Sequence, residues 1–274
     1  WLFIPALSFE GIALATIIIE AMGTIYLGKK IAKEYLFCKG SLRMMIPGIE
    51  YLEIIKQGIP AGLNMLTMAL GIFSITYFIS FFGEAYVAAY GIAIRIEQIG
   101  LMPLIGLMIA TLAIVGQNNG ADQMERVKET IKLARKYGFY LMTITASLTF
   151  VFASPLIALF SDDSKVITIG SSYLQVTAFI SWAYVIISIN IAALQGLKKP
   201  LFGFYMGLYR QLFAPILVYY LLTRIFSFGV FSIWLGILSI NWVGAIFTWF
   251  YLKSILNKQS FQNNLNPESV LLKI

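Results

Sequence analysis

The chain has 274 residues, of which 59% are hydrophobic and only 12% are charged. Soluble domains carry about 25% charged residues, so this composition excludes an ordinary soluble domain and indicates a polytopic membrane protein. The net charge of +7 does not indicate nucleic-acid binding, because the charges fall in short patches between apolar stretches, as topology signals do. We therefore expect a lipid bilayer as a partner, and no nucleic acid.

The residue types exclude several kinds of site. The sequence has no His and a single Cys, Cys38, which excludes His-based acid–base chemistry, Cys/His zinc sites and an internal disulfide. It also lacks the G-x-x-x-x-G-K-[ST] phosphate-binding loop. We expect a protein that is not an enzyme and needs no cofactor, with Na⁺ as the only metal ion that remains in question. An ion or concentration gradient would then supply the energy for any work.

Seven apolar stretches are long enough to cross a bilayer as helices. In chain order they cover residues 9–28, 54–82, 83–121, 132–152, 166–194, 201–222 and 230–252. The expected fold class is all-α, a polytopic bundle of about seven transmembrane helices. The charged segment 121–137 is expected to be helical and to lie along the cytoplasmic surface, as a solvated connector.

Most of the 20 basic residues lie in alternate connections, after the first, third, fifth and seventh stretches. Because Lys and Arg are enriched in cytoplasmic loops, this alternation predicts a cytoplasmic C-terminus and a first stretch that begins outside. The expected location is a multi-pass protein of a prokaryotic cytoplasmic membrane.

The third stretch carries charged residues in the middle of an apolar span. Glu97 lies near its centre, with Arg95 and Gln98 beside it. An acid in such a span is read by default as a functional site. We interpret Glu97 as a carboxyl group that alternates between protonated and charged states, and a structural interhelical hydrogen bond or ion pair is the alternative. As a helix the apolar part would rise roughly 48 Å, so bending is expected at Gly100 and Pro103.

Polar side chains in other stretches are candidates for the lining of a cavity. They are Asn64, Thr67 and Met68 in the second stretch, Gln175 and Asn190 in the fifth, and Arg210 in the sixth. Amides, hydroxyls, Met and aromatic side chains suit bulky, weakly polar cations. Pro60 is a further candidate hinge. Glu20, in the first stretch, is a second intramembrane acid, of lower rank because its side chain could equally reach the interface.

Several segments together resemble a known family. They are, in order, KQGIPAGLNM, AYGIAIRIEQIGLMPLIGLMIATLAIVGQNNGA, LFSDDSKVITIGSSYL, ALQGLKKP and YRQLFAPI. In this order they are similar to the multidrug and toxic compound extrusion (MATE) family. The resemblance implies twelve spans in two six-helix lobes, which rock to export organic, mostly cationic compounds in exchange for H⁺ or Na⁺.

The resemblance also implies domain boundaries. Residues 1–28 would be the last helix of a truncated N-terminal lobe, 29–50 a cytoplasmic linker, 51–256 the C-terminal six-helix lobe and 257–274 a cytoplasmic tail. Many family members carry an acid eight residues after the Pro of a G-x-P motif, where this chain has Met68. Glu97 matches the RIE position of the family. Because the acid after the G-x-P motif is missing, Glu97 becomes the stronger candidate for the residue that binds the coupling ion.

The expected function is secondary active antiport of a small organic substrate against H⁺ or Na⁺, with the missing N-terminal lobe as a partner. A lipid-linked oligosaccharide flippase shares the two-lobe architecture, but it should offer a large cationic cavity. Here only Arg95 and Arg210 are expected deep in the membrane, because Lys56, Lys132, Arg135 and Lys136 lie at the ends of their stretches and count with the connections. A seven-helix receptor has the same expected layout of termini, but the seventh stretch has no central Lys for a retinal Schiff base.

Overall fold

The computed structural model describes residues 8–33, 48–222 and 229–265. Every element in these ranges is helical, which confirms the all-α class. The elements are α1 (Ser8–Lys33), α2 (Gly48–Ser80), α3 (Glu84–Gly120), α4 (Met124–Val151), α5 (Ala153–Ala158), α6 (Ser164–Gly196), α7 (Leu201–Leu208), the π-helical segment η2 (Tyr209–Phe213), α8 (Ala214–Tyr220) and α9 (Val230–Leu265).

Four helical segments in the described ranges are long and apolar enough to cross a membrane. They are Glu84–Gly120, Ser164–Gly196, Leu201–Tyr220 and Val230–Lys258. The chain divides into two units, residues 1–54 and 55–274. In the first unit, the described side chains of α1 are exposed, including that of Glu20. The second unit holds the candidate site.

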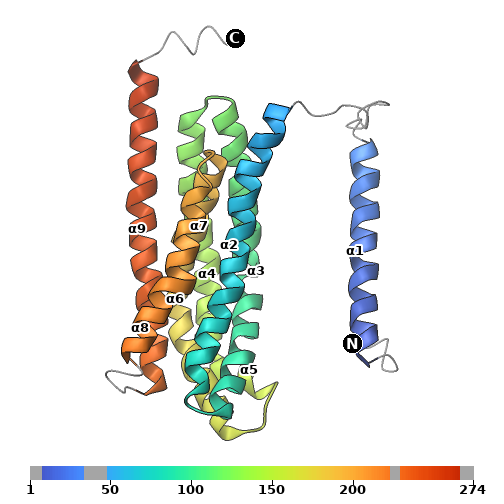
Figure 1. Cartoon of the computed structure of the whole chain (residues 1–274), viewed down its shortest axis with the longest axis vertical. Helices are drawn as coiled ribbons and strands as arrows, with labels where there is room; N and C mark the ends of the chain where they lie inside the picture. Colours follow the sequence, from blue (N-terminus) through green and yellow to red (C-terminus); the bar gives the residue numbers. More distant parts are fainter. Residues whose placement is uncertain (1–7, 34–47, 223–228, 266–274) are drawn as a thin grey trace. The chain divides into compact units, whose positions relative to one another are not determined.

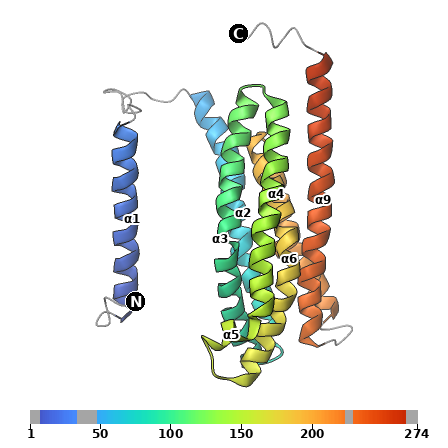
Figure 2. The same ribbon diagram turned by 180° about the vertical axis from the view of Figure 1, so that it is seen from behind.

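Helix α6 lies at the centre of the second unit. It packs against α3, α4, α5, α7 and α9, and the two opposite views show α3 and α4 side by side with it (Figures 1 and 2). A helix that is apolar all round is a buried one, and 72% of the most apolar window of α6 is buried. The helix begins at a defined point, because the Asp163 carboxylate accepts a hydrogen bond of 2.8 Å from the backbone N–H of Lys165.

The charged segment 121–137 is helical from Met124 onward, as expected. Those residues from Met124 onward form the first half of α4, which runs without interruption to Val151. Val127 and Ile131 are buried on one face, while most of the charged residues, such as Arg126, Lys132 and Lys136, are exposed. The buried positions continue with helical spacing through Ala134 and Met142, so this segment and the fourth apolar stretch form one helix.

The sixth stretch is not a regular α-helix. Pro215 has no N–H to donate to the carbonyl of residue 211, and the preceding turn widens into the π-helical segment η2. This segment carries Arg210. It also packs against α2 at Gly71, where a Cβ would overlap the side chain of Gln211. By contrast, α3 continues through both Gly100 and Pro103, so bending there stays a prediction.

Candidate functional site

The carboxyl group of Glu97 lies where α3 packs against α6. The hydroxyl of Tyr173 on α6 donates a hydrogen bond of 2.7 Å to Glu97 Oε2. Glu97 Oε1 is buried and has no hydrogen-bond partner among the described residues. Tyr184 of α6 and Arg210 of η2 also interact electrostatically with this carboxyl group. Tyr173 therefore holds Oε2, while Tyr184 and Arg210 are the other polar side chains that act on this carboxyl group.

Aromatic side chains close one side of this group. The rings of Tyr90 and Tyr173 meet edge to face at 5.3 Å, and Tyr173 meets Trp234 of α9 at 4.9 Å. All three residues are buried. Because these rings replace water, a charge on Glu97 depends on the few polar groups that reach it.

Arg210 is held by α9. Its Nε and Nη2 donate hydrogen bonds of 3.0 and 2.6 Å to Asn241 Oδ1, and its guanidinium carbon lies 5.5 Å from the centre of the Tyr184 ring. Asn241 is fixed in turn, because its Nδ2 donates to the carbonyl of Ile237 at 2.7 Å. Within the described ranges the only ion pair closer than 4.0 Å joins Lys128 to Glu125. Glu97 and Arg210 therefore face each other without direct contact.

The structure brings only some of the sequence candidates to this place. Arg95, Gln98 and Gln175 are exposed. Thr67 is buried in α2, and the side chains of Asn64, Met68 and Pro60 lie outside the described set. Asn190 is completely buried and accepts hydrogen bonds from Arg135 of α4. It lies roughly 9 Å along α6 from Tyr184, at 1.5 Å per residue. Of the proposed set, Glu97 and Arg210 come together.

Sequence reasoning missed five residues of this group, namely Tyr90, Tyr173, Tyr184, Trp234 and Asn241. The aromatic residues gave no signal, because aromatic side chains are common throughout the chain. Asn241 did give a signal, since it is a lone amide in the middle of the seventh apolar stretch. An amide at that depth needs a partner, and Arg210 of the preceding stretch supplies it.

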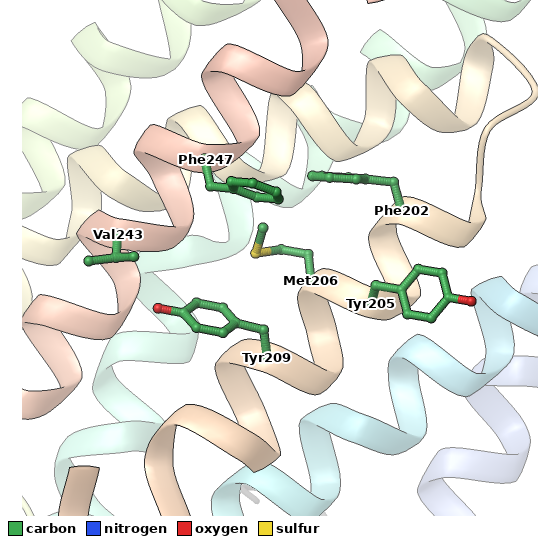
Figure 3. A pocket seen from close by; sticks show the side chains of 6 residues that line it. All are labelled: Phe202, Tyr205, Met206, Tyr209, Val243 and Phe247. Carbon is green, nitrogen blue, oxygen red and sulfur yellow. The ribbon is translucent and has the colours of Figure 1, made fainter. Parts of the chain in front are cut away.

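A pocket of about 320 Å³ lies beside this group. It is lined by Phe202, Tyr205, Met206, Tyr209, Val243 and Phe247, which come from α7, η2 and α9 (Figure 3). Figure 3 shows the Tyr209 ring directed toward Val243 and the Met206 side chain directed toward Phe247. A concave site of this size with aromatic and Met walls suits a weakly polar organic molecule. Tyr209 precedes Arg210, so the pocket and the Glu97 group share η2.

Comparisons with known proteins point to one family. The MatE family model matches residues 60–221. The probable multidrug resistance protein NorM of Thermotoga maritima is 23% identical over 239 residues, which cover 86% of this chain and 51% of the relative. A protein of the same name from Neisseria meningitidis serogroup B is 26% identical over 245 residues, which cover 88% of this chain and 53% of the relative.

A solved structure shares the fold. It is a MOP superfamily transporter from Pyrococcus furiosus, with a TM-score of 0.84, 23% sequence identity and a match that covers 94% of this chain and 59% of the other. The chain spans about half the length of the curated relatives it matches. The family model nevertheless covers more than half of the chain. The resemblance seen in the sequence is thereby confirmed, and the chain belongs to the MatE family of membrane transporters, which are not enzymes.

Proposed function

We propose that the chain supplies the second lobe, and the last helix of the first, of a secondary active antiporter that exports organic, cationic, drug-like compounds. The domain boundaries at residues 28, 50 and 256, and the cytoplasmic C-terminus, are part of this proposal. Membership of the MatE family supports it, as do relatives that are named probable multidrug resistance proteins.

The observation that carries the proposal is the carboxyl group of Glu97, which lies between α3 and α6 with Tyr173, Tyr184 and Arg210 around it. Charge on a carboxyl group that is shielded from water is unfavourable, and uptake of a proton or a cation there removes that charge. Uptake removes the charge that Tyr173 and Arg210 otherwise stabilise. Because the group lies between α3, α6 and η2, its charge state biases how these elements pack.

The same geometry favours H⁺ over Na⁺. Hard cations are bound by several oxygen ligands at once, whereas the described neighbours of Glu97 offer two Tyr hydroxyls and no second carboxylate. The guanidinium of Arg210, fixed by Asn241, also repels a second cation. A proton needs one oxygen and no coordination shell.

The proposed cycle uses this difference. Glu97 takes a proton from outside, and the neutral group favours one arrangement of the two lobes. Substrate binds between the lobes from inside once the proton has left, and it is released outside on the reverse movement. The two ligands alternate because each favours a different arrangement.

The test is transport by the complete transporter in liposomes, with export driven by an imposed pH gradient or an imposed Na⁺ gradient. We expect pH-driven export by the unaltered protein and at least a tenfold loss in Glu97→Gln. The control is Glu84→Gln, which makes the same change at an exposed acid at the start of the same helix. Unchanged export by Glu97→Gln would remove Glu97 from the coupling. Export driven only by Na⁺ would overturn the choice of ion, and export that responds to neither gradient would overturn antiport.

A further inference from the structure

Arg135 is a second cation held between three helices, at a distance from the Glu97 group. Its Nε and Nη2 donate hydrogen bonds of 3.0 and 2.6 Å to Asn190 Oδ1 of α6. Its guanidinium carbon lies 4.0 Å from the centre of the Trp249 ring of α9. Because Asn190 is completely buried, the inner edge of the guanidinium is fixed in position.

The positive charge of Arg135 has no counter-ion in the described part of the chain. No carboxylate lies within 4.0 Å of it there, and the nearby Glu125 is paired with Lys128. The N–H groups on its outer edge make no hydrogen bond to any described residue, and the buried Nδ2 of Asn190 also lacks a partner. A partly buried cation without an anion is unfavourable, so an anion from outside the chain is expected to complete the site.

If the hydrocarbon crossing of α9 begins at Val230, Arg135 lies near the level where this helix leaves the hydrocarbon. Trp249 is roughly 29 Å along α9 from Val230, close to the thickness of a hydrocarbon core of about 30 Å. Trp is enriched at this interface. Exposed Lys132 and Lys136 flank Arg135 on α4.

We infer that Arg135, oriented by Asn190 and Trp249, binds the phosphate group of an anionic phospholipid between α4 and α9. A guanidinium presents two parallel N–H groups to phosphate oxygens, which a Lys cannot do. Basic pockets between transmembrane helices at the cytoplasmic side suit such headgroups. The membrane supplies the anion at high local concentration, which favours a lipid phosphate over a free one. This site does not depend on the proposed antiport.

The test is titration of the complete chain in detergent with phosphatidylglycerol, phosphatidylcholine or inorganic phosphate, with bound lipid counted by native mass spectrometry. We expect phosphatidylglycerol to bind with at least tenfold lower affinity to Arg135→Gln. Arg135→Lys, which keeps the charge and loses the paired N–H groups, should lose severalfold. Lys136→Gln is the matched control, and a general surface charge predicts a loss of at most about fivefold there.

Two results would overturn the inference. If Arg135→Lys binds like the unaltered chain and Arg135→Gln binds like Lys136→Gln, lipid attraction comes from surface charge alone. If inorganic phosphate or phosphatidylcholine binds as tightly as phosphatidylglycerol, and with the same dependence on Arg135, the site does not select an anionic lipid. Thermal unfolding without added lipid shows whether each variant is folded. If Arg135→Gln does not fold, the comparison of Arg135→Lys with the unaltered chain still decides the test.

Discussion

Two partly buried cations, Arg210 and Arg135, are held in the same way. Arg210 and Arg135 each donate from Nε and Nη2 to the side-chain oxygen of an Asn on another helix, at 3.0 and 2.6 Å in both pairs. Each also lies over an aromatic ring. A neutral amide satisfies the guanidinium without cancelling its charge. The positive charge therefore remains available, to Glu97 in one case and to an anion from the membrane in the other.

At the residue scale, Asn241→Leu tests how far Arg210 depends on this amide. The substitution leaves a buried guanidinium without its two hydrogen bonds, and we expect a loss of about 2–3 kcal/mol in unfolding free energy. Thermal unfolding of the detergent-solubilised chain measures it. The control on the same helix is Ser239→Ala, because Ser239 is exposed and bonds only the carbonyl of Leu235. Equal shifts in the two variants would show that Asn241 does not hold Arg210.

At the element scale, glycine sets how closely α6 approaches α3. A Cβ on Gly196 would lie 2.8 Å from Val115 Cγ1 and 3.0 Å from the backbone nitrogen of Gly116. Such distances are shorter than carbon contacts allow, so the two helices meet backbone to backbone at this end. The carboxyl group of Glu97 lies in the same α3–α6 interface, so its contact with Tyr173 depends on this approach.

We expect Gly196→Ala to lower the unfolding free energy by about 1–3 kcal/mol, because the added methyl group must push α6 away from α3. Gly106→Ala on α3 is the matched control, since nothing lies within 4 Å of its Cβ position. Ala also favours a helix over Gly by about 1 kcal/mol, so the control should not be destabilised. Both unfolding midpoints can be read by thermal denaturation in detergent. A fall of equal size in the control would argue against close packing as the cause.

The π-helical segment is the element that joins the two candidate sites. Residue 209 lines the pocket and residue 210 faces Glu97, so a change in the winding of η2 would move both side chains together. Pro215 disfavours a regular α-helix here, because it has no N–H to donate to the carbonyl of residue 211. Ion uptake and the shape of the pocket can therefore be coupled within a single turn.

At the scale of the whole molecule, the orientation in the membrane is open to a direct measurement. The alternation of basic residues predicts that Cys38 faces the cytoplasm, and Cys38 is the only Cys of the chain. It lies outside the described residues. We expect a membrane-impermeant maleimide to label it in inverted vesicles and not in intact cells. In a Cys38→Ser background, Asp162→Cys, in the turn before α6, should show the opposite pattern. Labelling of Cys38 from outside would reverse the proposed orientation.

Composition and pattern determined the fold class, the membrane location and the family, because long apolar stretches and motif order are properties of the chain alone. They also picked out Glu97, since an acid in an apolar span stands out at any depth. The continuous α4 was not predicted, because a charged face obscured its apolar stripe.

Only the tertiary structure decided which side chains complete each site. In the sequence, Tyr173 lies 76 residues after Glu97, and Asn241 lies 31 residues after Arg210. Asn190 was expected to line a cavity, yet the packing of α4 on α6 places it against Arg135. Such pairings depend on how packed helices are rotated and how closely they approach each other. Glycine contacts and the π-helical turn determine that arrangement here, and the sequence of a single apolar stretch does not reveal it.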